Sequence, residues 1–321
     1  MDPLLKVDHL TTVFDLPSGS VPAVDDVSFE VQQGETLGVV GESGSGKSVT
    51  AFSIMRLVQP PGRIARGAVY FKGRDLLTLP EREMQSVRGA EISLIFQEPM
   101  TALNPVFTVG DQLRETLIVH GRATRQQARQ RAIELLDAVR IPDAERRVSD
   151  YPHQLSGGQR QRVLIAMALA CKPALVIADE PTTALDVTIQ AQILELLREM
   201  KSSYNLSLLL ITHDLGVIAE TADRVAVMYA GRVVEQGTVR EIFRQPQHPY
   251  TRGLLASMPG GAPGTRLRAI EGTVPMLGAL PPGCAFNTRC PDRFDPCTGA
   301  PPGDYVTAPG HTAKCYLHAA R

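Results

Sequence analysis

The sequence predicts an α/β fold, in which a parallel sheet is preceded by an antiparallel β cap, interrupted by a helical insertion and followed by a small Cys-rich extension. Three observations predict it. A glycine-rich loop connects an apolar run at residues 36–40 to a helix-like segment. An unbroken apolar run at residues 175–178 leads into two acids, as expected for a buried parallel strand with a ligand site at its carboxyl end. Between about Met100 and Ala170 the pattern changes from strands and turns to helical spacing.

Length and composition limit the number of domains, the kinds of partner and the cellular location that we expect. The 321 residues, 43% of them hydrophobic, suffice for one large domain or two. The formal net charge of −1 gives no broad basic surface, so we expect no nucleic-acid partner. No apolar run approaches the roughly 18 residues that a membrane span needs, and the N-terminus lacks the pattern of a signal peptide, so we expect a cytosolic protein.

The β cap is expected at the N-terminus. Residues 4–7 and 27–31 are typical of short strands, and residues 18–20 of a hairpin tip. Phe14 is the aromatic residue of this region best placed in sequence to stack on an adenine ring. A core Phe in a small sheet explains it equally well, and both interpretations remain open at this point.

The loop at residues 41–48 has the full spacing of a phosphate loop, with the strand before it and the helix after it that such a loop requires. Its glycines let backbone N–H groups turn inward, and the following helix directs its positive dipole end to the same point. Lys47 would reach the β- and γ-phosphates, and the Ser48 hydroxyl would ligate Mg²⁺. The residues predicted to hold the nucleotide are Gly41, Ser43, Gly44, Ser45, Gly46, Lys47, Ser48 and Val49.

Further site residues follow in the central part of the chain. The apolar strand at residues 92–96 ends at Gln97, whose amide is a candidate contact for Mg²⁺ and water. In the helical insertion, Thr124 and Gln127 form a capping-box pattern ahead of an apolar face. The insertion ends in a second predicted anion-binding helix start, because a cap alone would explain a Ser but not the Gly-Gly-Gln that follows. This second set comprises Ser156, Gly157, Gly158 and Gln159.

Two strands deliver polar groups to one sheet edge. Asp179 would belong to the Mg²⁺ shell, and Glu180 could accept a proton from an attacking water. The strand at residues 206–212 brings His213, which could hydrogen-bond a γ-phosphate oxygen. Residues 225–229 and 232–236 are expected to form a closing hairpin, followed by a helix at 239–243.

These motifs, in this order, resemble the ATP-binding-cassette (ABC) ATPases across roughly residues 4 to 245, together with Ala184, Leu185 and Asp186. The resemblance implies a head-to-tail dimer, in which Ser156 and Gly158 of one subunit close over ATP held by the other. It implies an ATPase core at residues 1–98 and 160–245, and a helical subdomain at 99–159. It also implies that residues 97–110 and this subdomain receive membrane subunits.

A narrower resemblance, carried by residues 96–105, 186–192 and 248–251 and by the cysteine tail, is to the peptide/nickel importers. Within them, Ser45 and residues 181–183 resemble the D-type ATPase of dipeptide and oligopeptide permeases. It implies an F-type companion ATPase, two integral membrane subunits and an extracytoplasmic solute-binding protein. The expected place is the cytoplasmic face of the cell membrane, as a peripheral protein. Carriage of nickel or another solute is the alternative within the family.

Residues 246–321 are rich in Pro and Gly, and we expect a loop-rich appendage without a sizeable core of its own. It contains four thiols, which favour metal ligation in a reducing compartment: Cys284, Cys290, Cys297 and Cys315. Their spacing suits zinc or an iron–sulfur cluster, and the importer resemblance favours [4Fe–4S], with zinc next and free thiols last. Cys171 is expected to be a core residue.

The leading hypothesis is therefore an ATP-hydrolysing subunit of a peptide importer, with ATP and Mg²⁺ as ligands. A DNA-repair or chromosome ATPase is the alternative of a different class. It predicts a coiled-coil or zinc insertion inside the cassette and a basic face, and the sequence has neither. A ribosome-associated ATPase would carry two cassettes in one chain.

Overall fold

The computed structural model describes residues 2–183, 185–258 and 269–319, and it divides the chain into two compact units. Unit 1 contains Met1–Gln32, Thr36–Leu77 and Ile211–Arg321, and unit 2 contains Gln33–Glu35 and Thr78–Leu210. Ala184, part of one predicted motif, lies outside the described residues. The predicted boundaries of the ATPase core, the helical subdomain and the extension differ from those of the two units. That three-part division stays a prediction.

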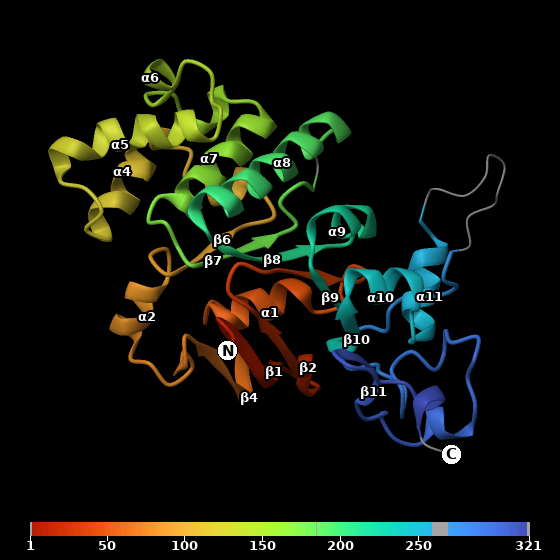
Figure 1. The fold of residues 1–321 in the computed structure, drawn as a ribbon. Coiled ribbons are helices and arrows are strands. Elements are labelled where there is room, and N and C mark those ends of the chain that lie inside the picture. Colours follow the sequence, from red (N-terminus) through yellow and green to blue (C-terminus); the bar gives the residue numbers. More distant parts are fainter. Residues whose placement is uncertain (1, 184, 259–268, 320–321) are drawn as a thin grey trace. The chain divides into compact units, whose positions relative to one another are not determined.

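An antiparallel sheet forms the cap in unit 1, with the strand order β2-β1-β4-β5 (Figure 1). The strands are β1 (Leu5–Leu16), β2 (Gly19–Val31), β4 (Gly62–Phe71) and β5 (Arg74–Asp75). The cap and its hairpin are confirmed, but both N-terminal strands are much longer than predicted. His9 and Asp26 have positive φ values, and the register of the β1–β2 pair shifts between Val7 and Leu10. These irregularities interrupt the alternation that reveals a strand in a sequence.

A second set of strands in unit 1 supports the glycine loop. Strand β3 (Thr36–Val40) pairs in parallel with β9 (Arg224–Tyr229), which forms the predicted antiparallel hairpin with β10 (Arg232–Thr238). All five residues of β3 are buried, as expected for a central parallel strand. The helices of this unit are α1 (Lys47–Ile54), α9 (Leu215–Thr221), α10 (Val239–Arg244) and α11 (Pro249–Ala256).

The C-terminal extension packs on the rest of unit 1 and shares its core. Strand β12 (His311–Ala313) pairs with β10, and β11 (Tyr305–Ala308) pairs with β12. Phe286 is 2% exposed, and its ring centroid lies 5.2 Å from that of Tyr229 and 5.4 Å from that of Tyr250. Two short 3₁₀ helices, η2 (Asp295–Thr298) and η3 (Tyr316–His318), complete the extension.

One buried carboxylate ties β10 to the extension. Glu235 accepts hydrogen bonds from the backbone N–H groups of Gln247 (2.7 Å) and His248 (2.9 Å), and His311 Nε2 lies 2.7 Å from its Oε1. The side chains of both Glu235 and His311 are at most 2% exposed. A carboxylate removed from water in this way is stable only with such partners.

Unit 2 contains a parallel pair, β6 (Ile92–Ile95) and β7 (Leu175–Asp179), and the chain leaves the unit within β8 (Ser207–Thr212). The predicted helical insertion is present. The helices of unit 2 are α2 (Glu81–Val87), α3 (Pro99–Ala102), α4 (Val109–Val119), α5 (Arg125–Ala138), α6 (Ala144–Arg147), η1 (Pro152–Gln154), α7 (Gly157–Leu169) and α8 (Val187–Tyr204). In Figure 1, α4, α5 and α7 gather into a layer of helices. The capping box of Thr124 and Gln127 at the start of α5 is confirmed.

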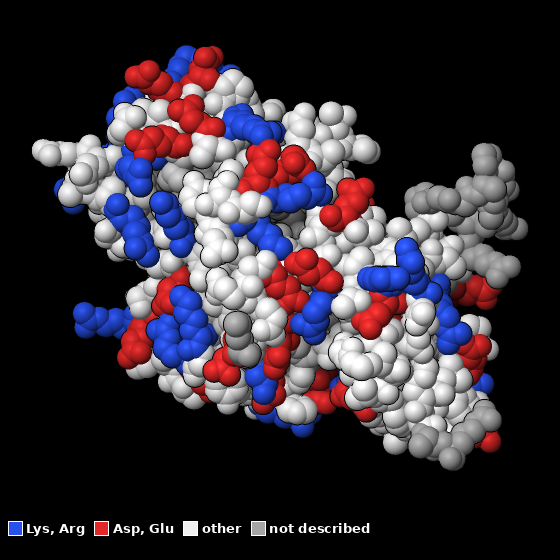
Figure 2. Space-filling model, viewed as in Figure 1, with Lys and Arg blue, Asp and Glu red and all other residues white. Residues whose placement is uncertain are grey.

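Acidic and basic side chains are interspersed over the face shown in Figure 2. Unit 2 contains short-range ion pairs, such as Arg131 with Glu134 at 2.6 Å and Arg147 with Asp150 at 2.7 Å. Among the described residues, no helix combines the length and the apolar character that a membrane span requires. Cys171, just after α7, is 3% exposed, as predicted.

Candidate nucleotide-binding site

The glycine-rich loop lies between β3 and α1, and it packs closely on the backbone of unit 1. A Cβ atom at Gly41 would lie 2.2 Å from the carbonyl oxygen of Met228. Gly46 has a φ of 96°, and a Cβ there would lie 2.6 Å from the carbonyl oxygen of Ala23. Both positions therefore require glycine, because any side chain would displace the loop.

Lys47 folds back over this loop. Its Nζ donates hydrogen bonds to the carbonyl oxygens of Gly41 (2.8 Å) and Glu42 (3.0 Å), and the residue is only 5% exposed. The ammonium group is thus held at the mouth of the loop by neutral acceptors, which phosphate oxygens can replace or supplement.

Ser45 is directed into the protein. It is fully buried, and its Oγ has no hydrogen-bond partner among the described residues. Its backbone N–H lies 3.2 Å from the carbonyl oxygen of Glu42. Of the predicted loop residues, Ser45 is therefore the one whose side chain is least accessible to a ligand.

In unit 2, the predicted acids end a buried strand. All five residues of β7 are buried, and Asp179 is 2% exposed. Glu180 follows with a φ of 47°, in the left-handed region that costs a residue with a side chain about 1–3 kcal/mol. The strand thus stops at Asp179, and the next side chain leaves in a new direction.

The structure brings two of the predicted residues of unit 2 together. Gln97 Nε2 donates to Glu180 Oε2 at 3.2 Å, and Thr183 Oγ1 donates to the same oxygen at 2.8 Å. These bonds fix the carboxylate at the ends of two neighbouring parallel strands, where ligand sites of α/β proteins lie. Thr183 was missed as a partner, although its spacing of three residues after Glu180 was visible.

The start of α7 is held by contacts within unit 2. Ser156 is the N-cap, its Oγ accepts a hydrogen bond from Gln159 N at 3.3 Å, and Gln159 Oε1 accepts one from Ser156 N at 3.0 Å. A Cβ at Gly158 would lie 2.7 Å from Cγ2 of Ile189 on α8. A complete capping box and a close helix contact therefore account for Gln159 and Gly158 locally, and the role of both residues at a nucleotide stays a prediction.

Phe14 and His213 both lie in unit 1. Phe14 is half-buried on β1, pairs with Gly62 of β4 and lies so close that a Cβ on Gly62 would be 2.9 Å from its ring. His213 is exposed just after β8, next to Asp214, the N-cap of α9. The predicted set is thus divided: the glycine loop, Phe14 and His213 belong to unit 1, and Gln97, Ser156 to Gln159, Asp179 and Glu180 to unit 2.

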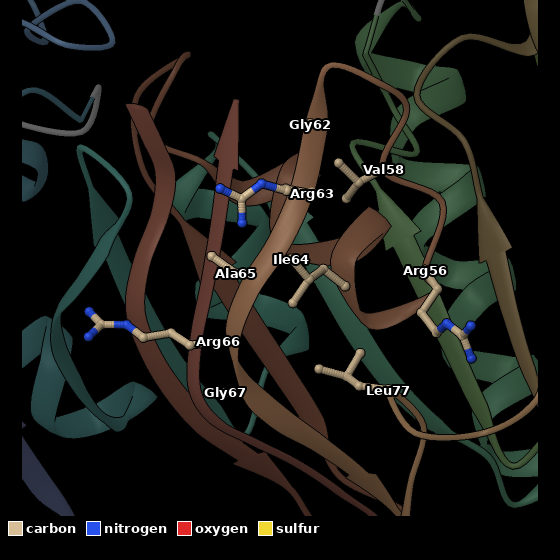
Figure 3. A pocket seen from close by; sticks show the side chains of 9 residues that line it. All are labelled: Arg56, Val58, Gly62, Arg63, Ile64, Ala65, Arg66, Gly67 and Leu77. Atoms are coloured by element: carbon tan, nitrogen blue, oxygen red, sulfur yellow. The ribbon is translucent and has the colours of Figure 1, made fainter. Parts of the chain in front are cut away.

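A pocket of about 480 Å³ on β4, shown in Figure 3, was not predicted from the sequence. Its three arginines already have partners within unit 1. Arg63 donates to Asp15 at 2.8 Å, Arg66 to the Thr11 hydroxyl at 2.9 Å and Arg56 to the Leu76 carbonyl at 3.2 Å. Figure 3 shows Arg56 on the opposite side of β4 from Arg63 and Arg66, so the three cations do not converge on one ligand.

The four C-terminal cysteines line one pocket together with Phe286 and Asn287. Burial raises the pKa of the Cys284 and Cys315 thiols and raises that of Cys290 to about 11. The part of the chain that the structure describes contains no group of three or more His, Cys, Asp or Glu side chains arranged to hold a metal ion. The thiols are thus neighbours, but they are not in the geometry of a formed metal centre.

Family models and relatives identify the chain. Residues 24–183 match the model of the ABC transporter, and residues 234–297 match that of the oligopeptide/dipeptide transporter C-terminal region. The dipeptide transport ATP-binding protein DppD of Bacillus subtilis is 53% identical over 99% of this chain and 95% of its own length. The oligopeptide transport ATP-binding protein OppD of Salmonella typhimurium is 51% identical over 98% and 93%. The chain belongs to the ABC transporter ATP-binding proteins.

A solved ABC cassette also resembles it. The dimeric post-hydrolysis state of the ATP-binding cassette MJ0796 bound to ADP and Pi matches 74% of this ABC protein and 99% of that chain, with a TM-score of 0.66 and 29% identity. The predicted fold class, a P-loop cassette with parallel and antiparallel strands and an inserted helical part, is confirmed.

Proposed function

We propose that this ABC protein is the ATP-hydrolysing subunit of an importer for dipeptides or oligopeptides. ATP hydrolysis is supported above all by the Gln97–Glu180 hydrogen bond, which holds a carboxylate at the end of a buried strand. The same chain also has a phosphate loop. The peptide part is supported by the relatives named above and by the match of residues 234–297 to the C-terminal region of peptide transporters.

The residues of this chain have the following proposed roles. The backbone N–H groups of residues 41–48 bind the phosphates, and Lys47 exchanges its carbonyl partners for β- and γ-phosphate oxygens. Glu180 accepts a proton from the attacking water or orients that water, with Gln97 and Thr183 holding its carboxylate.

A hydroxyl, a carboxylate and an amide oxygen are donors that suit Mg²⁺, and we assign them to Ser48, Asp179 and Gln97. The ion would neutralise charge on the phosphates when bound. His213 would donate to the γ-phosphate, and Phe14 would stack on the adenine.

The subunit would act in a head-to-tail pair with an F-type companion ATPase. In that arrangement Ser156 to Gln159 of this chain close over the nucleotide held by the companion. The hydroxyl of Ser156 is an acceptor in the capping box, and it retains its proton to donate to a phosphate oxygen. The dimeric form of the similar MJ0796 cassette supports the pairing.

Membrane partners are proposed to dock on the segment after Gln97. Three large apolar side chains are exposed there: Met100 by 62%, Val106 by 71% and Phe107 by 51%. Exposed apolar groups clustered along one segment mark interaction sites. The proposed place of the protein is the cytoplasmic face of the membrane, on two integral membrane subunits that receive peptide from an extracytoplasmic binding protein.

We also propose that Cys284, Cys290, Cys297 and Cys315 hold a metal centre, with [4Fe–4S] as the first choice and zinc as the second. Their shared pocket supports this proposal. Since a bound thiolate must lose its proton, loading would move the ligands closer together and release protons. Anaerobic purification should give a brown protein with iron and sulfide, whereas a colourless protein with stoichiometric zinc would overturn the first choice.

The decisive experiment is purification of the intact membrane complex, followed by measurement of ATP turnover with added solutes and the binding protein. Dipeptides or oligopeptides should stimulate turnover. If nickel alone stimulated ATP turnover, nickel and not a peptide would be the transported solute. If the protein purified without any integral membrane protein, the importer proposal would be refuted.

A further inference from the structure

Glu42, the second residue of the glycine-rich loop, is held by two residues from the C-terminal part of the chain. Its carboxylate receives both terminal nitrogens of Arg289, with Nη1 to Oε2 at 2.6 Å and Nη2 to Oε1 at 3.0 Å. Its backbone N–H donates to the Tyr250 hydroxyl at 2.9 Å. The paired arrangement of guanidinium and carboxylate fixes direction as well as distance.

Arg289 is itself immobilised. Its side chain is 4% exposed and lies over the rings of Tyr229, at 5.7 Å, and Phe286, at 5.9 Å. Its Nε donates to the carbonyl of Glu271 at 2.9 Å. A guanidinium group that is stacked, buried and hydrogen-bonded through all three nitrogens has little freedom to move. It therefore fixes the position of the carboxylate that it binds.

The segment that carries Arg289 belongs to the cysteine-lined part of the extension. Cys284 N donates to the carbonyl of Cys297 at 2.9 Å, and Arg289 N donates to the carbonyl of Phe286 at 3.0 Å. Cys290 is the next residue in the chain. The backbone around Arg289 is therefore set by the fold of the extension.

The opposite side of Glu42 meets the phosphate-binding lysine. The carbonyl oxygen of Glu42 accepts from Lys47 Nζ at 3.0 Å and from Ser45 N at 3.2 Å. Glu42 thus contacts the Arg289 guanidinium through its carboxylate and the Lys47 ammonium through its carbonyl oxygen. All these groups lie in unit 1.

We propose that Arg289 is a positioning residue for the phosphate loop, which fixes Glu42 so that Lys47 and the loop N–H groups are preorganised for ATP. Through this contact the C-terminal extension sets the nucleotide affinity of the cassette. Preorganisation raises affinity because the free loop has less freedom to lose on binding. The inference rests on the proposed nucleotide site and is independent of the transported solute.

The test measures binding of a fluorescent ATP analogue to the full chain, with thermal unfolding followed in parallel. Arg289→Gln should raise Kd by roughly 3- to 30-fold, the range in which residues without ligand contact modulate binding. The Kd of Arg289→Lys should lie between those of the wild type and Arg289→Gln, since an ammonium keeps the positive charge but cannot form the paired contact. The matched control is Arg293→Gln, an exposed arginine of the same segment, which should bind as the wild type does.

A double-mutant cycle separates positioning from general destabilisation. Glu42→Gln should weaken binding like Arg289→Gln, and the double variant should be no weaker than either single variant, because one contact is lost in all three. In the intact complex, the KM for ATP should rise while kcat at saturating ATP stays near the wild-type value. If Arg289→Gln does not fold, Arg289→Lys and Glu42→Gln supply the comparison.

The inference is overturned if the variants lower only the unfolding midpoint and leave Kd unchanged, which would make the contact structural. Losses that add in the double variant would overturn it too. If the wild-type chain itself does not bind the analogue, the proposed nucleotide site fails, which is a separate result.

Discussion

His248 makes the stability of unit 1 depend on pH in a direction that the structure fixes. The side chain is 1% exposed, and its Nδ1 accepts a hydrogen bond from Tyr250 N at 3.0 Å, capping α11. Burial, with the nearby charges of Arg252 and His318, lowers the pKa of His248 to about 3 from an ordinary 6.5. The folded protein therefore keeps this imidazole neutral, while the unfolded chain protonates it below pH 6.5.

The direction of this pH dependence follows from the number of protons that each state binds. Between pH 6.5 and 3 the unfolded state binds more protons, so the free energy of unfolding falls as pH falls through this window. Each pH unit is worth about 1.4 kcal/mol, so a fall from pH 7 to pH 5 should cost about 2 kcal/mol at this residue.

Urea unfolding followed by circular dichroism at pH 7, 6 and 5 measures this effect. His248→Asn keeps a side-chain acceptor for the N-cap and cannot titrate, so it should lose about 2 kcal/mol less than the wild type between pH 7 and pH 5. The control is His153→Asn at an exposed position, which should follow the wild type. If His248→Asn and the wild type lose the same stability on acidification, the buried neutral imidazole is not the cause.

Three further predictions concern the site in unit 2. Glu180→Gln should retain ATP binding while turnover falls by a factor on the order of 10²–10⁴ in the purified complex, and full activity would remove Glu180 from its role. Thr183→Val removes one of the two donors to that carboxylate, and the loss of about 1 kcal/mol should lower kcat about fivefold without raising KM, so an unchanged kcat would count against the contact. Gly158→Ala should lower the free energy of unfolding by about 1–3 kcal/mol, because the added methyl group would meet Ile189. Ile189→Ala combined with it should recover part of that loss, and two simply additive losses would refute the steric explanation.

The sequence predicted those features whose chemistry is local. The glycine loop, the buried strand before Asp179 and the capping box at Thr124 are each specified by residues within a few positions of one another. The sequence also placed Gln97 and Glu180 at strand ends, and the parallel pairing of β6 with β7 brings them within hydrogen-bonding distance.

Features that depend on distant residues escaped prediction. The core of the extension joins Tyr229, Tyr250 and Phe286, and Arg289 meets Glu42 across 247 positions of sequence. No local pattern reports such a contact, because each residue alone is compatible with many environments. The sequence of the tail, rich in Pro and Gly, indicated a loop-rich appendage and did not reveal that Phe286 packs against Tyr229 and Tyr250.

The buried carboxylate of Glu235 has a consequence for how the molecule can be divided. Because its hydrogen-bond partners Gln247, His248 and His311 all follow β10, cutting the chain after β10 would remove these partners together with the strand β12 that pairs with β10 at Glu235. Within unit 1, β10 and the tail therefore share one core, and a gene shortened after β10 would encode a weakened protein.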